Sequence, residues 1–272
     1  MSGNHPKIRL DIVMVDQGLA PTRSKAQALV MSGQVYQGEK RLDKAGLLVS
    51  TDISLIIRGE TLPFVSRGGL KLQKAISAFS LNLNGKICID AGASTGGFTD
   101  CMLQHGAVKV YAVDVGYGQL AWSLRSNERV VVLERTNVRY LDESHVPELI
   151  DFASADVSFI SLRLILPALR GRLKDDGEVV CLVKPQFEAG REFVGKKGVV
   201  RDAKVHLAVL EQFLLDAEAS DFTVKAFNFS PIRGPEGNIE YLAHLAVAST
   251  ERYTGDLSAL VEASHEDLED KA

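Results

Sequence analysis

Residues 87–100 read ICIDAGASTGGFTD, and this stretch decides the fold of the larger part of the chain. Residues 87–89 are typical of the end of a buried strand, which Asp90 closes. Three glycines then crowd a short turn, and an amphipathic helix is predicted from Phe98 onward. Because glycine lets a backbone approach a ligand closely, this strand, turn and helix N-terminus predict a binding site for a nucleotide-like ligand.

The spacing of the glycines argues against two familiar phosphate sites. Ala93 stands where G-x-G-x-x-G needs a second close approach, and Gly96 and Gly97 are adjacent. The turn also has no lysine followed by Ser or Thr to hold a phosphate chain. It suits a bulky adenosine compound without phosphates, and S-adenosylmethionine is the cofactor we expect. A glycine-rich turn that binds nothing is the alternative.

Strand-like and helical segments alternate through the rest of the chain. The strands are predicted at residues 86–91, 109–113, 130–133, 152–157, 178–183, 223–228 and 241–247, and the clearest helix at 202–219. This order predicts an α/β fold with a doubly wound, Rossmann-like parallel sheet. Ligands of such sheets bind beyond the C-terminal strand ends, which gathers Asp90, Asp114, Asp156 and Lys184 at one edge.

Two residues at this edge suit an adenosine ligand. Asp114 closes the second strand, and its carboxylate can accept hydrogen bonds from both hydroxyls of a ribose. Asn137 follows the third strand and can pair with the edge of an adenine. Asp and Asn are also common in turns, so a purely structural role is the alternative for each.

Lys184 ends an otherwise apolar strand, where an unpaired charge is costly. Pairing with Asp156 removes that cost. Glu240 lies just before the last strand, within a Pro- and Gly-rich segment. A cluster of lysines and carboxylates beside a methyl donor suits deprotonation of a weakly acidic hydroxyl by a lysine. The donor is itself the electrophile, so we expect no metal.

The two ends of the chain differ in charge. Residues 1–75 contain 11 Lys/Arg and 6 Asp/Glu, whereas residues 251–272 contain 2 and 7, within a net charge of −4. The basic end predicts two helices, at 8–20 and 23–33 with Thr22 as N-cap, and then short strands within 34–44 and 47–57. A basic end can attract phosphates although the whole chain is acidic.

The amino-acid composition narrows the class of protein further. No apolar run approaches the roughly 18 residues of a membrane span, and the N-terminus lacks the apolar segment of a signal peptide, so we expect a cytoplasmic protein without a membrane partner. The three cysteines have no C-x-x-C spacing and are expected to be reduced core thiols. The six histidines show no H-x-x-x-H pair.

The segment R-L-D followed by T-R-S-K-A-Q-x-L-V-x-S-G-Q-V resembles the RNA-binding module named after ribosomal protein S-four, over about residues 8–60. Tyr36 and Gln37 depart from the Val-Asn pair usual in that family. The resemblance implies a small α+β RNA-binding domain. Basic residues expected to contact RNA are Arg9, Arg23, Lys25, Lys40, Arg41 and, beyond the module, Arg67. A small interaction domain with a solvated basic helix is the alternative.

Five further motifs occur in order: S-R-G-G-L-K-L, D-x-G-A-S-T-G-G-F-T-D, A-D-V-S-F-I-S, V-K-P-Q-F-E and G-x-x-G-N-x-E. With the basic module they resemble the TlyA (hemolysin A) family, whose catalytic domain is FtsJ-like and methylates the 2′-hydroxyl of cytidine in ribosomal RNA. The resemblance implies a catalytic tetrad of Lys71, Asp156, Lys184 and Glu240, with Lys184 as proton acceptor. It also implies that S-adenosylmethionine is held by Asp90, Gly92, Ser94, Gly96, Gly97, Phe98, Asp114 and Asn137.

These observations predict three parts: an RNA-binding domain at 1–60, a methyltransferase domain at 61–250 and an acidic tail at 251–272, partly disordered or loosely helical. The expected partner is ribosomal RNA or a ribosomal subunit. A non-catalytic ribosome assembly factor is the main alternative function, and a hemolysin is a second.

Overall fold

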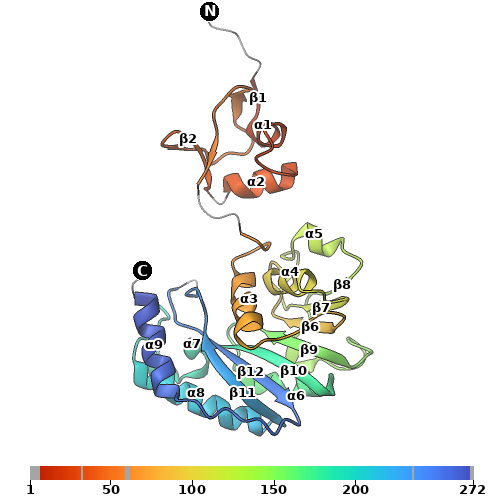
Figure 1. Cartoon of the computed structure of the whole chain (residues 1–272), viewed down its shortest axis with the longest axis vertical. Coiled ribbons are helices and arrows are strands. Elements are labelled where there is room, and N and C mark those ends of the chain that lie inside the picture. The colour runs from red at the N-terminus through yellow and green to blue at the C-terminus, as the bar shows by residue number, and fades with distance from the viewer. Residues whose placement is uncertain (1–6, 32, 59–61, 235, 270–272) are drawn as a thin grey trace, which may run out of the picture. The chain divides into compact units, whose positions relative to one another are not determined.

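The computed structural model describes residues 7–31, 33–58, 62–234 and 236–269 (Figure 1). The chain divides into two compact units, Met1–Thr61 and Leu62–Ala272. The predicted α/β class is confirmed, with a small α+β unit before the large sheet.

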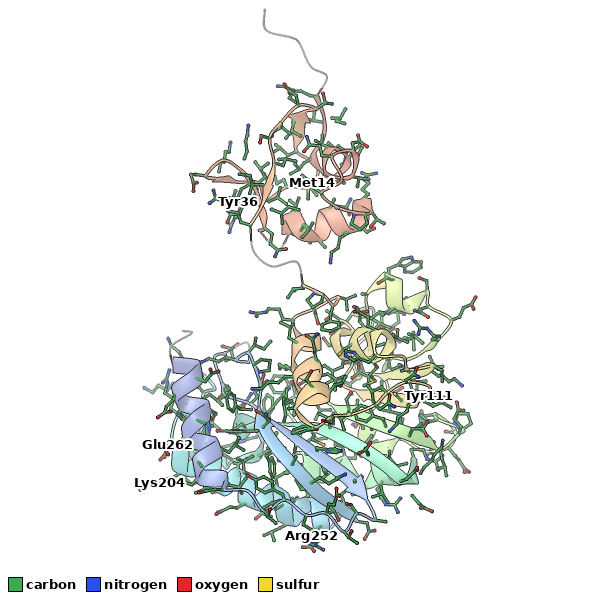
Figure 2. The ribbon with its side chains drawn as sticks, viewed as in Figure 1. Met14, Tyr36, Tyr111, Lys204, Arg252 and Glu262 are labelled. Atoms are coloured by element: carbon green, nitrogen blue, oxygen red, sulfur yellow. The ribbon has the colours of Figure 1, made fainter. Side chains whose placement is uncertain are left out.

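The N-terminal unit packs two helices against short strands. Thr22 Oγ1 accepts a hydrogen bond from Lys25 N over 3.2 Å, which confirms the predicted cap. Met14, labelled in Figure 2, is fully buried in the core of this unit. The elements are β1 (Lys7–Arg9), α1 (Leu10–Asp16), α2 (Arg23–Met31), β2 (Val35–Gln37), β3 (Lys40–Arg41), β4 (Leu48–Ser50) and β5 (Ile56–Ile57). Of these, β1 was not predicted; it pairs antiparallel with β4.

The second unit is built on a seven-stranded sheet of order β11-β12-β10-β9-β6-β7-β8. Its strands are β6 (Ile87–Ala91), β7 (Lys109–Val113), β8 (Val130–Leu133), β9 (Ile150–Ala155), β10 (Leu173–Val183), β11 (Phe222–Phe229) and β12 (Tyr241–Val247). The pairs from β10 to β8 are parallel, but β12 is antiparallel to both β10 and β11. The predicted doubly wound parallel sheet is therefore confirmed, with β12 as an antiparallel strand that was not predicted.

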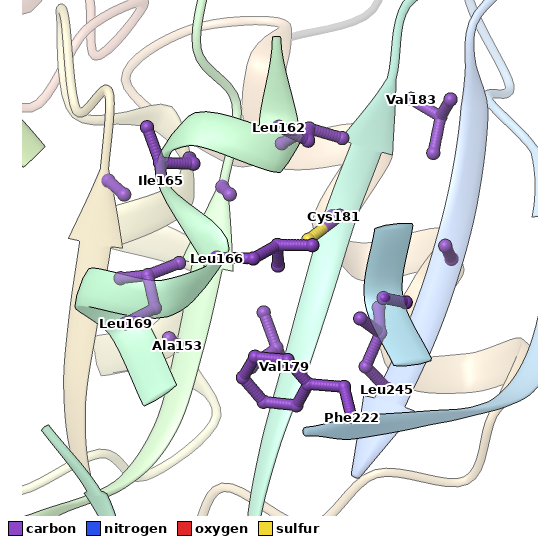
Figure 3. Packing of buried hydrophobic residues seen from close by; sticks show 14 of the residues in the cluster. Ala153, Leu162, Ile165, Leu166, Leu169, Val179, Cys181, Val183, Phe222 and Leu245 are labelled. Carbon is purple, nitrogen blue, oxygen red and sulfur yellow. The ribbon is translucent and has the colours of Figure 1, made fainter. Parts of the chain in front are cut away.

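Helices cover both faces of this sheet, so its strands are apolar on both sides. Successive residues of β10 alternate between the two apolar layers: Val179, Cys181 and Val183 face one, Val180 and Leu182 the other. Figure 3 shows the first layer, where Leu166 points toward Cys181 and Leu162 and Leu169 belong to the same cluster. All three cysteines are buried and free, as predicted.

Helices and helical turns connect the strands. They are α3 (Gly68–Ala78), α4 (Gly97–Gln104), α5 (Trp122–Arg125), η1 (Val138–Tyr140), η2 (Leu162–Leu164), α6 (Leu166–Arg170), α7 (Pro185–Glu188), η3 (Arg191–Phe193) and α8 (Ala203–Glu218). The acidic tail ends in α9 (Leu257–Glu269), which lies beside α8 in Figure 1 and buries Val261 and Ser264. The tail is therefore helical over this span, the second of the two predicted possibilities.

Candidate active site

Four polar side chains meet at the C-terminal edge of the parallel strands. Lys71 comes from α3, while Asp156 and Lys184 directly follow β9 and β10. Glu240 precedes β12, whose first residue, Tyr241, pairs with Val183. Because β12 runs against its neighbours, its N-terminal end lies where the parallel strands finish, and this brings Glu240 to the same edge.

The four side chains form a continuous chain of ion pairs. Lys71 Nζ lies 2.6 Å from Glu240 Oε2 and 3.7 Å from Asp156 Oδ2. Lys184 Nζ lies 2.6 Å from Asp156 Oδ1. Asp156 thus bridges the two lysines.

Lys71, Lys184 and Glu240 are buried, so each charge depends on its partner. Burial disfavours the charged form of Lys71, but the charges of Asp156 and Glu240 outweigh it and raise the pKa of Lys71 above its ordinary value. Lys71 is therefore held as a cation.

Sequence reasoning missed two polar neighbours of the tetrad. Ser158 Oγ accepts a hydrogen bond from Lys184 Nζ over 3.2 Å. Gln186 Nε2 donates to Glu240 Oε1 over 3.4 Å. Both residues lie in the quoted motifs, Ser158 two positions after Asp156 and Gln186 two positions after Lys184. This i+2 spacing is the sequence feature that could have identified them.

A cavity of about 470 Å³ adjoins the tetrad. Asp156 and Ser158 form part of its wall. Four of the residues predicted to hold the cofactor also line it: Gly92, Ser94, Asp114 and Asn137. The cavity and the tetrad therefore share one wall, which places a bound ligand next to the lysine–carboxylate cluster.

The backbone of Gly92 forms part of the wall of this cavity. Its φ is +87°, and a Cβ at this position would lie 2.5 Å from the carbonyl oxygen of Asp156. No side chain fits there without displacing Asp156.

Asp114 presents its carboxylate to the cavity. Its two oxygens accept hydrogen bonds from Ser94 N over 2.7 Å and from Gly116 N over 2.6 Å. A carboxylate has about four acceptor positions, so two are left for ligand hydroxyls. Asn137 accepts from Arg139 N over 3.0 Å and so caps η1, while still lining the cavity.

The other four residues predicted for the cofactor are not among the residues that line this cavity. Asp90 is fully buried, and its carboxylate accepts from Thr99 Oγ1 over 2.6 Å and from Ser154 Oγ over 3.1 Å. Burial raises its pKa to about 6. Gly96, Gly97 and Phe98 pack against Leu124, Ser66 and Gly68 respectively. Their part in cofactor binding stays a prediction.

A larger cavity, of about 740 Å³, lies between η2, η3 and α8. Its lining includes Phe193, Val209 and Phe213 and is mainly apolar. None of the predicted site residues lines it. The smaller cavity is the candidate site because it is lined by Asp156 of the tetrad and by Gly92 and Ser94 of the glycine-rich turn.

In the N-terminal unit, a buried carboxylate orients two of the predicted RNA-binding arginines. Asp11 accepts hydrogen bonds from Arg9 and Arg23, each within 3.0 Å, and from Gln27 Nε2 over 2.7 Å. The two arginine side chains are 41% and 53% exposed, so guanidinium groups reach solvent from fixed positions. Lys25 is half-buried, whereas Lys40, Arg41 and Arg67 are exposed.

The fold and the site define a methyltransferase of the Rossmann-like class. Residues 64–247 match the family described as FtsJ-like methyltransferase, and residues 8–52 match the S4 domain. The chain belongs to the FtsJ-like methyltransferase family, in the group that includes proteins named TlyA and hemolysin A. This confirms the sequence resemblance for both parts of the chain.

Three known proteins illustrate the relationship. The Bacillus subtilis protein named "Putative rRNA methyltransferase YqxC" is 51% identical over 271 residues, 97% of this chain and 96% of that protein. The Mycobacterium tuberculosis protein named 16S/23S rRNA (cytidine-2′-O)-methyltransferase TlyA is 42% identical over 240 residues, 88% and 90% of the two chains. The solved "Putative hemolysin from Streptococcus thermophilus" is 48% identical, with a TM-score of 0.77 over 98% of both chains.

Membership of this family makes S-adenosylmethionine the cofactor of this enzyme. The cavity fits it: the volume suits a nucleoside-sized ligand, Asp114 retains acceptor positions for ribose hydroxyls, and Gly92 leaves room for close approach. None of the helices in the described ranges is both long and apolar enough to cross a membrane.

Proposed function

We propose that this protein transfers a methyl group from S-adenosylmethionine to the 2′-hydroxyl of a cytidine in ribosomal RNA. The observation that carries the proposal is the lysine–carboxylate tetrad, whose Asp156 lines the cofactor cavity. The names of the TlyA relatives supply the cytidine and the ribosomal RNA. A ribosomal RNA substrate agrees with the expected cytoplasmic location.

In this proposal Lys184 is the proton acceptor. The bound cofactor supplies an electrophilic methyl group on sulfur. The ribose oxygen gives its proton to a neutral Lys184 amine as it forms its bond to the methyl carbon and the carbon–sulfur bond breaks. Asp156 holds Lys184 at 2.6 Å and stabilises the ammonium that results.

Lys71 and Glu240 position the ribose. The pKa of Lys71 lies above its ordinary value because two carboxylates outweigh its burial, so this lysine is a poor base and a good hydrogen-bond donor. Glu240 keeps Lys71 in place through the 2.6 Å ion pair.

The cofactor is held by Gly92, Ser94, Asp114 and Asn137 on the cavity wall, supported by Asp90, Gly96, Gly97 and Phe98. The RNA is bound by residues 1–60 through Arg9, Arg23, Lys25, Lys40 and Arg41, and by Arg67 in the methyltransferase domain, residues 61–250. Positive side chains held in fixed positions suit the phosphates of a structured RNA. The acidic tail, 251–272, is the third part.

The test is transfer of a labelled methyl group from S-adenosylmethionine to ribosomal subunits, with the product nucleoside identified by mass spectrometry. We expect 2′-O-methylcytidine, and a loss of about 10²- to 10⁴-fold in Lys184→Ala, the usual range for a general base. Full activity of Lys184→Ala would contradict the assigned mechanism. If the wild-type protein binds subunits and cofactor but transfers no methyl group, the non-catalytic assembly role is favoured instead.

A further inference from the structure

Ser158 is the one residue that both lines the cofactor cavity and contacts Lys184 without carrying a charge, among the contacts recorded for the described residues. It follows β9 by three residues and shares its segment with Asp156. Neither sequence reasoning nor the tetrad gives it a role.

The contacts of Lys184 define directions at its nitrogen. A neutral lysine amine has two N–H bonds and one lone pair, arranged tetrahedrally with Cε. Asp156 Oδ1 at 2.6 Å and Ser158 Oγ at 3.2 Å are two acceptors for the two N–H bonds. When both are engaged, the lone pair has a single remaining direction.

Lys71 has a different set of partners. Its nitrogen faces two carboxylates, Glu240 at 2.6 Å and Asp156 at 3.7 Å, which favour the ammonium form. Lys184 has one carboxylate, which it shares with Lys71, and one neutral hydroxyl. The second partner therefore separates the two lysines: Lys71 faces a second carboxylate, whereas Lys184 faces the neutral hydroxyl of Ser158.

The segment that carries Ser158 is held firmly at its start. Asp156 N donates to the carbonyl of Ala91 over 2.9 Å, and the side-chain-free Gly92 closes against the Asp156 carbonyl. At its end, Phe159 has a φ of +64°, a strained conformation for a bulky residue that occurs at functional sites. A backbone fixed on both sides suits a side chain that orients the side chain of another residue.

We propose that Ser158 is a positioning residue that accepts one N–H of Lys184 and so directs the lone pair of Lys184 at the 2′-hydroxyl of the acceptor ribose. This inference rests on the proposed function. The proton passes from the ribose oxygen to Lys184 Nζ, the oxygen–methyl bond forms, and the carbon–sulfur bond breaks; Ser158 neither gains nor loses a proton.

The experiment compares Ser158→Ala, Ser158→Thr and Ser144→Ala in methyl transfer to ribosomal subunits. Ser144 is an exposed serine whose hydroxyl bonds only to its own turn, at Asp142 and His145, and serves as the matched control. Melting temperature and calorimetric binding of S-adenosylmethionine check that each variant is folded and binds cofactor.

For Ser158→Ala we expect kcat to fall between about 10-fold and 100-fold, as for a misplaced reacting group, with KM for subunits and cofactor affinity unchanged. Ser158→Thr keeps the hydroxyl and should recover most of the rate.

An unchanged kcat in Ser158→Ala overturns the inference. So does a fall in kcat that Ser158→Thr does not reverse, since that pattern belongs to a structural role. A wild-type protein that transfers no methyl group to subunits contradicts the proposed function itself, so the two failures are distinguishable.

Discussion

Glu240 Oε2 lies 2.6 Å from Lys71 Nζ, although 169 residues separate them in the chain. One side chain comes from the first helix of the methyltransferase unit and the other from the loop before its last strand. Both are buried, so this ion pair joins the two ends of the unit at the active site.

Replacing Glu240 alone should lower the free energy of unfolding more than replacing both residues of this ion pair. Glu240→Leu leaves Lys71 with only the more distant Asp156, and we expect the free energy of unfolding to fall by about 3 kcal/mol, the lower end for a broken buried pair. Lys71→Met with Glu240→Leu leaves no uncompensated charge and should recover part of that loss. Urea denaturation measures both variants. If the losses in free energy of unfolding caused by the two substitutions simply add in the double variant, the two residues are not coupled.

Gly92→Ala should abolish cofactor binding. The added Cβ would meet the Asp156 carbonyl at 2.5 Å and force the cavity wall to move. Gly85→Ala is the matched control, because Gly85 also has a positive φ, +75°, but no atom lies within 4 Å of the added carbon. Calorimetric titration with S-adenosylmethionine compares them. Equal affinities in the two variants would mean that the close approach at Gly92 does not shape the site.

Asp114→Ala should weaken S-adenosylmethionine binding by about 10-fold to 100-fold, which corresponds to hydrogen bonds to one charged group. Asp142→Ala is the control, since Asp142 is an exposed carboxylate bonded to Ser144 and His145. The measurement is again the dissociation constant of the cofactor. If Asp114→Ala binds S-adenosylmethionine with unchanged affinity, this carboxylate only stabilises the turn.

The raised pKa of Asp90 predicts that the stability of the protein depends on pH. Its pKa is about 6 in the folded protein, because burial outweighs its hydrogen bonds, against 3.8 ordinarily. Between these values the folded state binds the extra proton, so stability falls as pH rises from about 4 to 6 and then levels off. The shift corresponds to about 3 kcal/mol at most.

Asp90→Asn removes this titration and retains groups that can bond Thr99 and Ser154. Relative to wild type, the variant should therefore be more stable at pH 8 than at pH 4, as measured by urea denaturation at both. A difference between the two proteins that does not change with pH would contradict the raised pKa.

Much of the fold was predictable because strands buried on both faces are continuous apolar runs. The bounds of β7, β8 and β12 agree with the predicted ranges. The predicted β9 was displaced: it was expected at 152–157 and spans Ile150–Ala155, because Asp156 leaves the ladder to enter the active site. The reversal of β12 was not predictable, since an apolar run has the same composition in either direction.

The candidate site was only partly predictable. The strand-end rule brought Asp114, Asp156 and Lys184 to one edge, and the structure agrees. The same rule does not tell an edge residue that faces the cavity from one that faces the core, so it could not separate Asp114 from the buried Asp90. It also missed Ser158, which lies beyond the strand.

The amino-acid sequence by itself determined the layered α/β class, the basic RNA-binding module and the chemical types at the strand ends, because these follow from local patterns of apolar, glycine and charged residues. Only the tertiary structure decided which lysine faces two carboxylates and which faces one. That difference depends on the antiparallel insertion of β12, which delivers Glu240 to Lys71, and on the turn after β9, which delivers Ser158 to Lys184. Distances of a few ångströms between side chains set the electrostatic environment of each lysine, and the order of residues along the chain does not contain them.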